Sequence, residues 1–397
     1  MLLELKARGF RNLEPLDLAF GAGAHLFLGD NGAGKTSVLE AVYLLSTTRS
    51  FRTANLVDCR HHGSESFFLN ASVLTASGAK AELGLSLVGA KRQRSLNGSS
   101  TSLAEHLKVL PVVAWSAADS DLLTASPQPR RRFLDRGVVS LRPQGLDDLA
   151  RYRRALAHKR ELLRRGQQSQ LRLWNRMLAS AAVPVIRQRT RYVELLEREF
   201  FKVLQAQDLG FDGLELRYRP SPRWFDPRKG SSFEPAAPAH SALNKPAGAG
   251  PATRGPANRG AVFELPGDEE LEALFLQGLE AIEADELRRA MPLLGPHRDD
   301  LGVVWSSKRL RKVASAGERK AVTLALIAAH GRVLEASGQR PIYLLDDLDA
   351  ELSRRTLESV WRGFGEPRQV LASSNRPEVF EALNLTAVHS LTGGVVS

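Results

Sequence analysis

The chain has 397 residues, 43% of them hydrophobic, and a formal net charge of +11. A chain of this length can bury a large core, and we expect two lobes rather than one. No apolar run approaches the ~18 residues of a membrane span, and the first residues lack the pattern of a signal peptide, so we expect a cytoplasmic protein. Cys59 is the single cysteine, which excludes an internal disulfide and favours a buried, inert thiol.

Residues 1–125 alternate apolar and polar side chains between turn signals such as 21–23 and 97–98, which predicts strands and hairpins. The apolar run 24–28 ends at a glycine-rich loop, and the apolar run 38–45 follows that loop. A strand, a loop and a helix in this order are the context of a phosphate-binding loop. We therefore predict that residues 1–125 form the first half of an α/β head.

The loop from Gly29 to Thr36 reads Gly-Asp-Asn-Gly-Ala-Gly-Lys-Thr and fits the pattern G-x-x-x-x-G-K-[ST]. Its glycines let backbone N–H groups turn toward a triphosphate, Lys35 reaches the β- and γ-phosphates, and the Thr36 hydroxyl can bind Mg²⁺. The alternative, a glycine-rich turn with an accidental lysine, does not explain the flanking strand and helix. The motif predicts ATP or GTP as the ligand, with Gly29, Asp30, Asn31, Gly32, Ala33, Gly34, Lys35, Thr36 and Ser37 as candidate contacts.

Residues 126–226 switch to a helical period and are predicted to form a basic helical arm, broken near Gly166 and Pro184. Within this segment, residues 128–172 hold 13 Lys and Arg against 4 Asp and Glu. Such a concentration of charge is expected on a surface that faces a polyanion such as DNA, although solvated helix faces can also be rich in arginine. The candidate phosphate contacts are Arg130, Arg131, Arg132, Arg153, Arg154, Lys159 and Arg160.

Residues 227–262 are predicted to be a disordered surface insertion. Over 227–261, 20 of 35 residues are Pro, Gly or Ala, and large apolar residues are nearly absent. The same stretch carries 5 Lys and Arg against 1 Asp or Glu, so it suits a passive linker or a weak contact with DNA. Order is expected to return in residues 263–397, a second α/β half of the head that begins with a helix near 269–291.

Two further motifs are expected to complete the nucleotide site. The apolar strand 341–345 ends in Asp346-Asp347, and the carboxyl ends of parallel strands are where such sheets bind ligands. We assign Asp346 to Mg²⁺ and Asp347 to the attacking water, with capping of a helix as the alternative role of Asp347. Ser315 and Gly317 begin a helical run and can bind an anion through a hydroxyl, free N–H groups and the helix dipole. The candidate catalytic residues are Lys35, Asp346 and Asp347.

The order of these motifs resembles the ABC-type ATPase heads of the SMC and recombination family, and within it the RecF family of bacterial recombination mediators. Lys35 and Asp346 are separated by 311 positions, with the Ser315 helix between them. Two positions depart from the family pattern, because Glu318 stands where Gln is usual and Ser353 stands where Asp is usual. Supporting strings occur along the whole chain, at 10–12 (Phe-Arg-Asn), 39–41 (Leu-Glu-Ala), 49–53 (Arg-Ser-Phe-Arg-Thr), 129–135 (Pro-Arg-Arg-Arg-Phe-Leu-Asp) and 295–301 (Gly-Pro-His-Arg-Asp-Asp-Leu).

The resemblance implies an α/β fold, an ABC-type P-loop ATPase head with a mixed sheet plus a helical arm. It implies a weak ATPase in which two subunits sandwich two ATP molecules, the loop of one subunit meeting Ser315 and Gly317 of the other. Arg11 and Asn12 would join the site, and Ser374 would sense the γ-phosphate unless it only forms a turn. The homodimer would bind single-stranded or gapped DNA and help load recombinase with RecO and RecR partners, in DNA repair, replication and the SOS response.

Two other classes of protein share the nucleotide loop. An ABC transport ATPase would couple to a membrane partner and is expected to lack a basic helical arm. A metabolic P-loop kinase would transfer phosphate to a small molecule and has no use for the Ser315 helix. Both remain alternatives to the DNA-binding ATPase.

Overall fold

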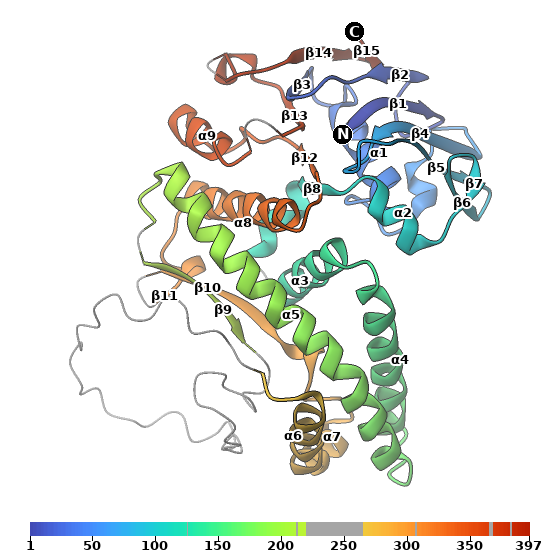
Figure 1. Cartoon of the computed structure of the whole chain (residues 1–397), viewed down its shortest axis with the longest axis vertical. Coiled ribbons are helices and arrows are strands. Elements are labelled where there is room, and N and C mark those ends of the chain that lie inside the picture. Colours follow the sequence, from blue (N-terminus) through green and yellow to red (C-terminus); the bar gives the residue numbers. More distant parts are fainter. Residues whose placement is uncertain (125, 212, 220–264, 306–307, 365–367, 382) are drawn as a thin grey trace.

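The computed structural model describes residues 1–397 except 125, 212, 220–264, 306–307, 365–367 and 382. It has two lobes, a head built on two sheets and an arm of helices that extends from the head (Figure 1). The predicted insertion 227–262 lies outside the described residues, within the range 220–264. Among the helices that are described, none has the length and apolar character needed to cross a membrane.

The first sheet of the head carries the glycine-rich loop. Its strand order is β15-β14-β3-β13-β12-β8, and every neighbouring pair is parallel except β14 with β15. Parallel strands bring their carboxyl ends to one edge of a sheet, so the residues that follow β3, β12 and β13 meet there. The strands are β3 (Ala24–Leu28), β8 (Val112–Trp115), β12 (Ile342–Leu345), β13 (Val370–Ser374), β14 (Ala387–Thr392) and β15 (Val395–Val396).

The second sheet of the head is antiparallel and packs on helix α1 (Lys35–Thr47). Val38, Leu39 and Val42 of α1 are fully buried in one core with side chains from both sheets. Because α1 is enclosed on several sides, apolar residues cover most of its surface instead of one face. The strands of this sheet are β1 (Leu2–Arg8), β2 (Leu16–Ala19), β4 (Ser66–Leu74), β5 (Lys80–Val88), β6 (Lys91–Leu96) and β7 (Ser99–Ser100).

The arm combines segments from both halves of the chain. Helices α4 (Gly145–Arg164) and α5 (Leu171–Gln207) pack as a hairpin, and α6 (Asp268–Ala281) packs on α5 (Figure 1). Phe275 and Leu279 of α6 are buried in the same core as side chains of α4 and α5. The expected boundary at residue 263 is therefore wrong, because α6 belongs to the arm and not to the head. The arm and its junction with the head also contain α3 (Pro127–Leu141), α7 (Glu283–Arg289), β9 (Leu214–Arg219), β10 (Asp300–Trp305) and β11 (Lys308–Arg309).

One of the two expected helix breaks is present. Gly166 follows α4 with a φ of 64°, a left-handed conformation that suits glycine. Pro184, by contrast, lies inside α5, which continues through it. Its neighbours Val183 and Val185 are buried in the core of the arm, and this packing offsets the backbone hydrogen bond that proline cannot make.

Helix α8 (Ala316–Ala336) connects the head with the arm. It packs on β8 and along α5, and every residue from Val322 to Ala329 is buried. His330 is also buried, with its Nδ1 atom 3.1 Å from the hydroxyl of Tyr192 on α5. Burial lowers the pKa of His330 to about 3, so its imidazole is neutral in the folded protein. Two shorter helices complete the head, α2 (Leu103–Val109) and α9 (Arg354–Trp361).

Acid is expected to destabilise the protein through His330. An unfolded histidine titrates near pH 6.5, so the unfolded chain binds the extra proton between about pH 6.5 and the folded pKa of about 3. Stability therefore falls as the pH drops through this window, by about 1.4 kcal/mol from this residue at a pH about one unit below 6.5. Urea unfolding is measured at a pH above 6.5 and at a pH about one unit below 6.5. The free energy of unfolding should fall less between the two in His330→Phe than in the wild type, and an equal fall in both proteins would contradict this explanation.

Candidate nucleotide-binding site

The loop between β3 and α1 has the geometry of a phosphate cradle. Gly29, Gly32 and Gly34 have φ values of 154°, 85° and 113°, and a Cβ atom at Gly29 would lie 2.4 Å from a backbone carbonyl oxygen. Lys35 Nζ donates to the carbonyl oxygens of Gly29 and Asp30 at 2.6 and 3.0 Å, which holds the ammonium group against the loop. The loop thus places a cation and the N-terminus of α1 around one space, as phosphate binding requires.

Asn12 braces this loop from the side. Its Nδ2 atom donates to the carbonyl oxygen of Gly32 at 2.7 Å, and its Oδ1 atom accepts from Ser37 Oγ at 2.7 Å. The amide therefore links the middle of the loop to the first turn of α1. The structure places these two predicted contact residues, Asn12 and Ser37, against the loop itself, where they set its shape.

The side chain of Arg11 pairs with Glu40 of α1. Arg11 Nε and Nη2 donate to the two carboxylate oxygens at 2.9 and 2.7 Å, and Glu40 is fully buried. Arg52 lies 3.5 Å from the same carboxylate, and Ser50 Oγ donates to it. Arg11 therefore neutralises a buried charge beside the loop, and its contact with a nucleotide stays a prediction. Glu40 belongs to the string 39–41, to which sequence analysis gives no role, although a carboxylate within an apolar helix is a signal of a buried ion pair.

Asp346 meets Thr36 at the carboxyl edge of the first sheet. Thr36 Oγ1 and Ser373 Oγ each donate to Asp346 Oδ1 at 2.8 Å. Burial raises the pKa of Asp346, and the two hydroxyl groups oppose that shift. Hydroxyl and carboxylate oxygens are ligands that suit Mg²⁺, which usually completes its shell with phosphate and water oxygens. In the part of the chain that is described, no group of three or more His, Cys, Asp or Glu side chains could hold a metal ion.

Ser373, and not Ser374, faces Asp346. Ser373 Oγ also accepts from the backbone N–H of Asp347 at 2.9 Å, whereas Ser374 Oγ accepts from the backbone N–H of Arg376 at 2.9 Å. The bond of Ser374 to Arg376 fits the alternative role of a turn, and its role as a γ-phosphate sensor stays a prediction; neighbours in a strand point to opposite faces. The side chain of Asp347 is exposed beside this pair, with a φ of 46° at its backbone.

Ser315 begins α8 with a capping box. Glu318 N–H donates to Ser315 Oγ at 3.3 Å, and a carboxylate oxygen of Glu318 accepts from Ser315 N–H at 2.7 Å. The backbone and hydroxyl bonds from Ser315 lower the pKa of Glu318, so the carboxylate is ionised and turned onto the helix end. The Ser315 hydroxyl accepts from the Glu318 N–H, and its own bond to the Glu318 carboxylate contributes to the lowered pKa. Glu318 thus fills the capping position that a glutamine can also fill.

Two of the residues predicted to contact DNA are buried and form ion pairs inside the fold. Arg130 Nε lies 2.6 Å from Asp300 Oδ1, and Lys159 Nζ lies 2.6 Å from a carboxylate oxygen of Glu286. Arg130 is 6% exposed and Lys159 is 0% exposed. The prediction that these two side chains contact DNA is wrong, because a count of charges along the sequence does not show which of them are paired inside the fold.

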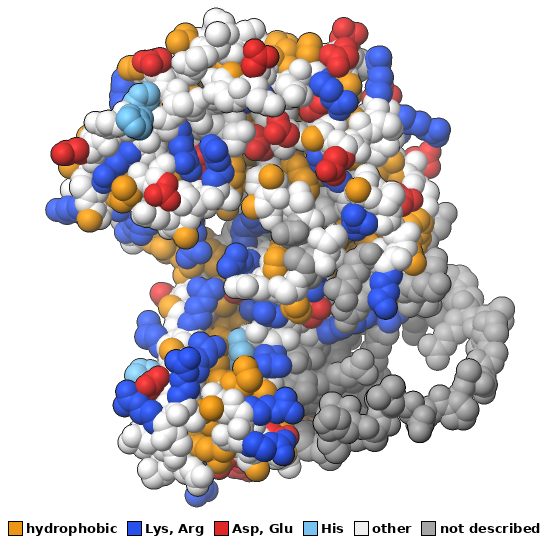
Figure 2. Space-filling model, turned by 180° about the vertical axis from the view of Figure 1, so that it is seen from behind, with side chains coloured by type: hydrophobic (Ala, Val, Ile, Leu, Met, Phe, Trp, Pro, Cys, Tyr) orange, Lys and Arg blue, Asp and Glu red, His pale blue; other side chains and the backbone are white. Residues whose placement is uncertain are grey.

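The other predicted basic contacts lie at the surface of the arm. Arg132, Arg154 and Arg160 are exposed, and Figure 2 shows Lys and Arg side chains gathered over the lower lobe. Arg153 is exposed and also pairs with Asp135 at 3.1 Å. Arg131 is half-buried and donates to the backbone carbonyl oxygen of Asp299, the residue before β10, at 3.0 Å. The arm therefore presents a basic surface made by fewer residues than the sequence suggests.

The strings at 129–135 and 295–301 meet in one buried network. Arg189 of α5 lies 2.7 Å from Asp135 and 3.4 Å from Asp299. The hydroxyl of Tyr152 lies 2.6 Å from His297 Nδ1, and burial lowers the pKa of His297 to about 3. This histidine is therefore neutral, and its contact with Tyr152 of α4 stabilises the junction of head and arm. Arg189, which lies in neither string, is the residue that sequence analysis does not identify.

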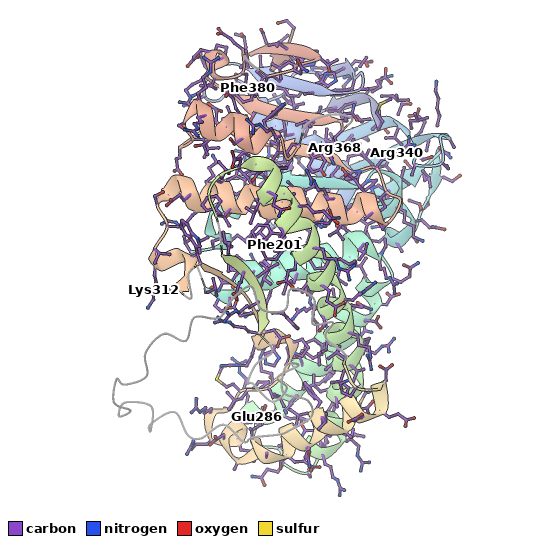
Figure 3. The ribbon with its side chains drawn as sticks, turned by 60° about the vertical axis from the view of Figure 1, so that its left-hand side comes forward. Phe201, Glu286, Lys312, Arg340, Arg368 and Phe380 are labelled. Atoms are coloured by element: carbon purple, nitrogen blue, oxygen red, sulfur yellow. The ribbon has the colours of Figure 1, made fainter. Side chains whose placement is uncertain are left out.

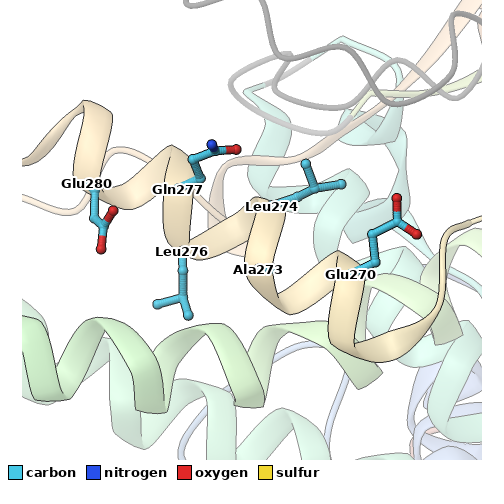
Figure 4. Close-up of a pocket in the computed structure, with 6 residues that line it drawn as sticks. All are labelled: Glu270, Ala273, Leu274, Leu276, Gln277 and Glu280. Carbon is cyan, nitrogen blue, oxygen red and sulfur yellow. The ribbon is translucent and has the colours of Figure 1, made fainter.

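A hollow of about 430 Å³ on the surface of α6 is a separate feature of the arm. In Figure 4, Leu276 and Glu280 point to the side of α6 on which α5 lies, while Glu270 and Gln277 point to the opposite side. Carboxylates repel phosphate groups, so this hollow does not suit a nucleotide. Its lining residues are Glu270, Ala273, Leu274, Leu276, Gln277 and Glu280.

The sequence matches the RecF/RecN/SMC N terminal domain family over residues 1–395. It is 32% identical to the DNA replication and repair protein RecF of Acidothermus cellulolyticus over 364 residues, which are 89% of this chain and 88% of the relative. The chain belongs to the RecF family. The RecF protein of Chloroherpeton thalassium is 28% identical over 408 aligned residues, which cover 100% of this chain and 99% of the relative.

Solved structures confirm the predicted fold. The recombination mediator protein RecF with ATP, of the RecFOR pathway, is 22% identical with a TM-score of 0.80, covering 100% of this chain and 96% of that one. An Smc head bound to the C-winged helix domain of ScpA is 14% identical with a TM-score of 0.55, covering 100% and 96% of the two chains. This member of the RecF family therefore has the predicted α/β fold, an ABC-type ATPase head with a helical arm.

Proposed function

We propose that this RecF-family protein is an ATP-dependent DNA-binding protein of recombinational DNA repair, DNA replication and the SOS response, and a weak ATPase of the cytoplasm. One observation carries the proposal, the presence in one chain of a phosphate cradle and an arm with exposed arginines. The cradle at 29–36 supports ATP as the cofactor. Arg132, Arg154 and Arg160 support contacts with DNA phosphates, which fix position without reading sequence.

Each side chain around the cradle has a separate role in ATP hydrolysis. Lys35 binds the β- and γ-phosphates from within the loop, and Thr36 with Asp346 holds Mg²⁺, which neutralises phosphate charge. Ser373 fixes the Asp346 carboxylate through the hydrogen bond at 2.8 Å. Asp347, exposed beside it, orients the attacking water. Asp346 and Asp347 thereby take different roles because one is buried and bonded while the other is exposed.

Ser315 and Gly317 supply the second half of the site to another copy of the chain. Ser315 is exposed at the N-terminus of α8, and its hydrogen bonds within the described residues run to Glu318 and Arg319 of α8 and not to the loop 29–36. A hydroxyl and a helix N-terminus suit a γ-phosphate, so ATP held in one subunit favours the homodimer. The dimer then encloses single-stranded or gapped DNA and helps to load recombinase with RecO and RecR partners.

The exposed arginines of the arm favour this function over an ABC transport ATPase. A transport subunit needs a surface for a membrane partner and gains nothing from a basic arm directed into solvent. The helix that begins at Ser315 likewise argues against a small-molecule kinase. Both alternatives predict a protein whose affinity for DNA does not depend on ATP.

Replacing Arg154 and Arg160 by glutamine is expected to weaken DNA binding and its dependence on salt. Each lost phosphate contact lowers the slope of log K against log salt by about 0.9 for duplex DNA and about 0.7 for single strands. Fluorescence anisotropy with DNA that carries a single-strand/double-strand junction, with ATP and from about 50 to about 200 mM salt, measures this slope. Arg362→Gln, an exposed arginine after α9, is the matched control. An unchanged slope and affinity in the double variant would remove the arm from the DNA contact.

A further inference from the structure

A backbone contact links the Asp346 edge of the sheet to the segment that leads into the arm. Leu345 pairs with Trp115 across β12 and β8, and Asp346 N–H donates to the carbonyl oxygen of Trp115 at 3.0 Å. The next residue, Ser116, caps the short 3₁₀ helix η2 (Ala117–Leu122). Ser116 N–H and Oγ both donate to one carboxylate oxygen of Asp119, at 3.1 and 3.3 Å. A shift of Asp346 along the strand therefore moves Trp115 through their hydrogen bond, and with it the adjacent Ser116, which holds the Asp119 carboxylate.

Asp119 carries the contact into α3. Its other carboxylate oxygen accepts from Arg136 Nη2 at 3.1 Å, and the two side chains are 14% and 30% exposed. Because the two oxygens are divided between Ser116 and Arg136, a movement of Ser116 turns the carboxylate and lengthens the bond to Arg136. Solvent screens a half-buried pair only in part, so a change in the distance between the two charges changes their interaction energy.

The residue before Arg136 joins α3 to the arm. Asp135 accepts from Arg189 of α5 at 2.7 Å and pairs with Arg153 of α4 at 3.1 Å. Figure 1 shows α3 between the head and α4. Asp135 and Arg136 are consecutive, so one turn of α3 holds both the bond to η2 and the bonds to the arm helices. Of the bonds in this series, the one between Asp119 and Arg136 crosses from η2 to α3.

We infer that the Asp119–Arg136 pair is a positioning element that transmits the nucleotide state at Asp346 to the DNA-binding helices of the arm. The inference rests on the proposed function and adds to it the residues that couple ATP to DNA. Neither side chain is among the residues proposed to contact nucleotide or DNA, so each acts through its neighbours. Arg136 directly follows the string 129–135 and is not among the residues proposed to contact DNA.

The test compares Arg136→Gln and Asp119→Asn with the wild type in the full chain. Each variant removes one charge; Asp119→Asn keeps the size of the side chain, Arg136→Gln shortens it, and asparagine can still accept from Ser116. Arg354→Gln is the matched control, because Arg354 forms an exposed ion pair with Glu358 within α9. The readout is the ratio of the DNA dissociation constants without and with ATP, measured by anisotropy beside the ATP dissociation constant without DNA.

We expect ATP to tighten DNA binding by about 5- to 150-fold in the wild type and the control, the usual range of coupling between sites. In either variant the ratio should fall below about two-fold, and the double variant should lose no more than the single ones, as expected for a pair that acts as a unit. Affinity for DNA without ATP should persist. A ratio retained in both variants, or a parallel loss of both DNA affinities, would overturn the inference, whereas a wild type without any ATP effect would overturn the proposed function itself.

Discussion

A Lys35→Met variant is expected to lose ATP hydrolysis and to bind ATP at least about 100-fold more weakly. Lys35 is 5% exposed and its ammonium group is held against the loop by the carbonyl oxygens of Gly29 and Asp30. Hydrogen bonds to charged groups contribute about 1.5–3 kcal/mol each, so two lost bonds to phosphate oxygens exceed the roughly 2.7 kcal/mol that a 100-fold change requires. Methionine keeps the volume of the side chain, which limits the change to the charge.

Titration with a fluorescent ATP analogue and a phosphate-release assay measure the two effects. Lys108→Met is the matched control, because Lys108 is exposed in the last turn of α2. The control should bind and hydrolyse ATP as the wild type does. Hydrolysis at the wild-type rate by Lys35→Met would show that the loop 29–36 is not where the chemistry occurs.

A Lys159→Met variant is expected to lose about 3–5 kcal/mol of stability, the usual cost of breaking a buried ion pair. Lys159 and Glu286 are both 0% exposed and lie 2.6 Å apart, at the contact of α4 with α7. Figure 3 labels Glu286 in the arm, far from the strands of the head. Removal of the lysine leaves a buried carboxylate whose remaining bond is to the backbone N–H of Leu293, at 2.7 Å.

Urea unfolding gives the change, with two further variants as controls. Lys159→Met combined with Glu286→Leu should recover much of the loss, because apolar pairs of similar volume replace buried ion pairs at little cost. Arg165→Met, which removes an exposed pair with Glu161 in the same helix, should cost less than about 1 kcal/mol. A loss below about 1 kcal/mol in Lys159→Met would contradict the burial of this pair.

The nucleotide site was accessible to sequence analysis because its parts are local. The loop from Gly29 to Thr36 is contiguous, and its strand and helix flank it directly. Asp346 follows an apolar strand, and parallel strands that end at one edge bring it to Thr36. The bond of 2.8 Å between these two residues agrees with the expectation that they share one site.

What the sequence did not show depends on tertiary packing. Arg130 and Lys159 are as basic as Arg154, and only their partners Asp300 and Glu286 distinguish a buried pair from a surface charge. Helix α6 has an amphipathic pattern that would suit the head or the arm equally. The choice between Ser373 and Ser374 depends on the register of β13 beside β12, because one residue reverses the face of a strand.

The most direct measurement is the mass of the wild-type protein in solution, by light scattering on a sizing column, with and without ATP and junction DNA. Ser315 and Gly317 belong to the partner's nucleotide in the proposed site, so ATP should convert a monomer to a dimer that retains the DNA. Lys35→Met should stay monomeric under the same conditions. A monomer that binds ATP and DNA together without dimerising would contradict the composite site.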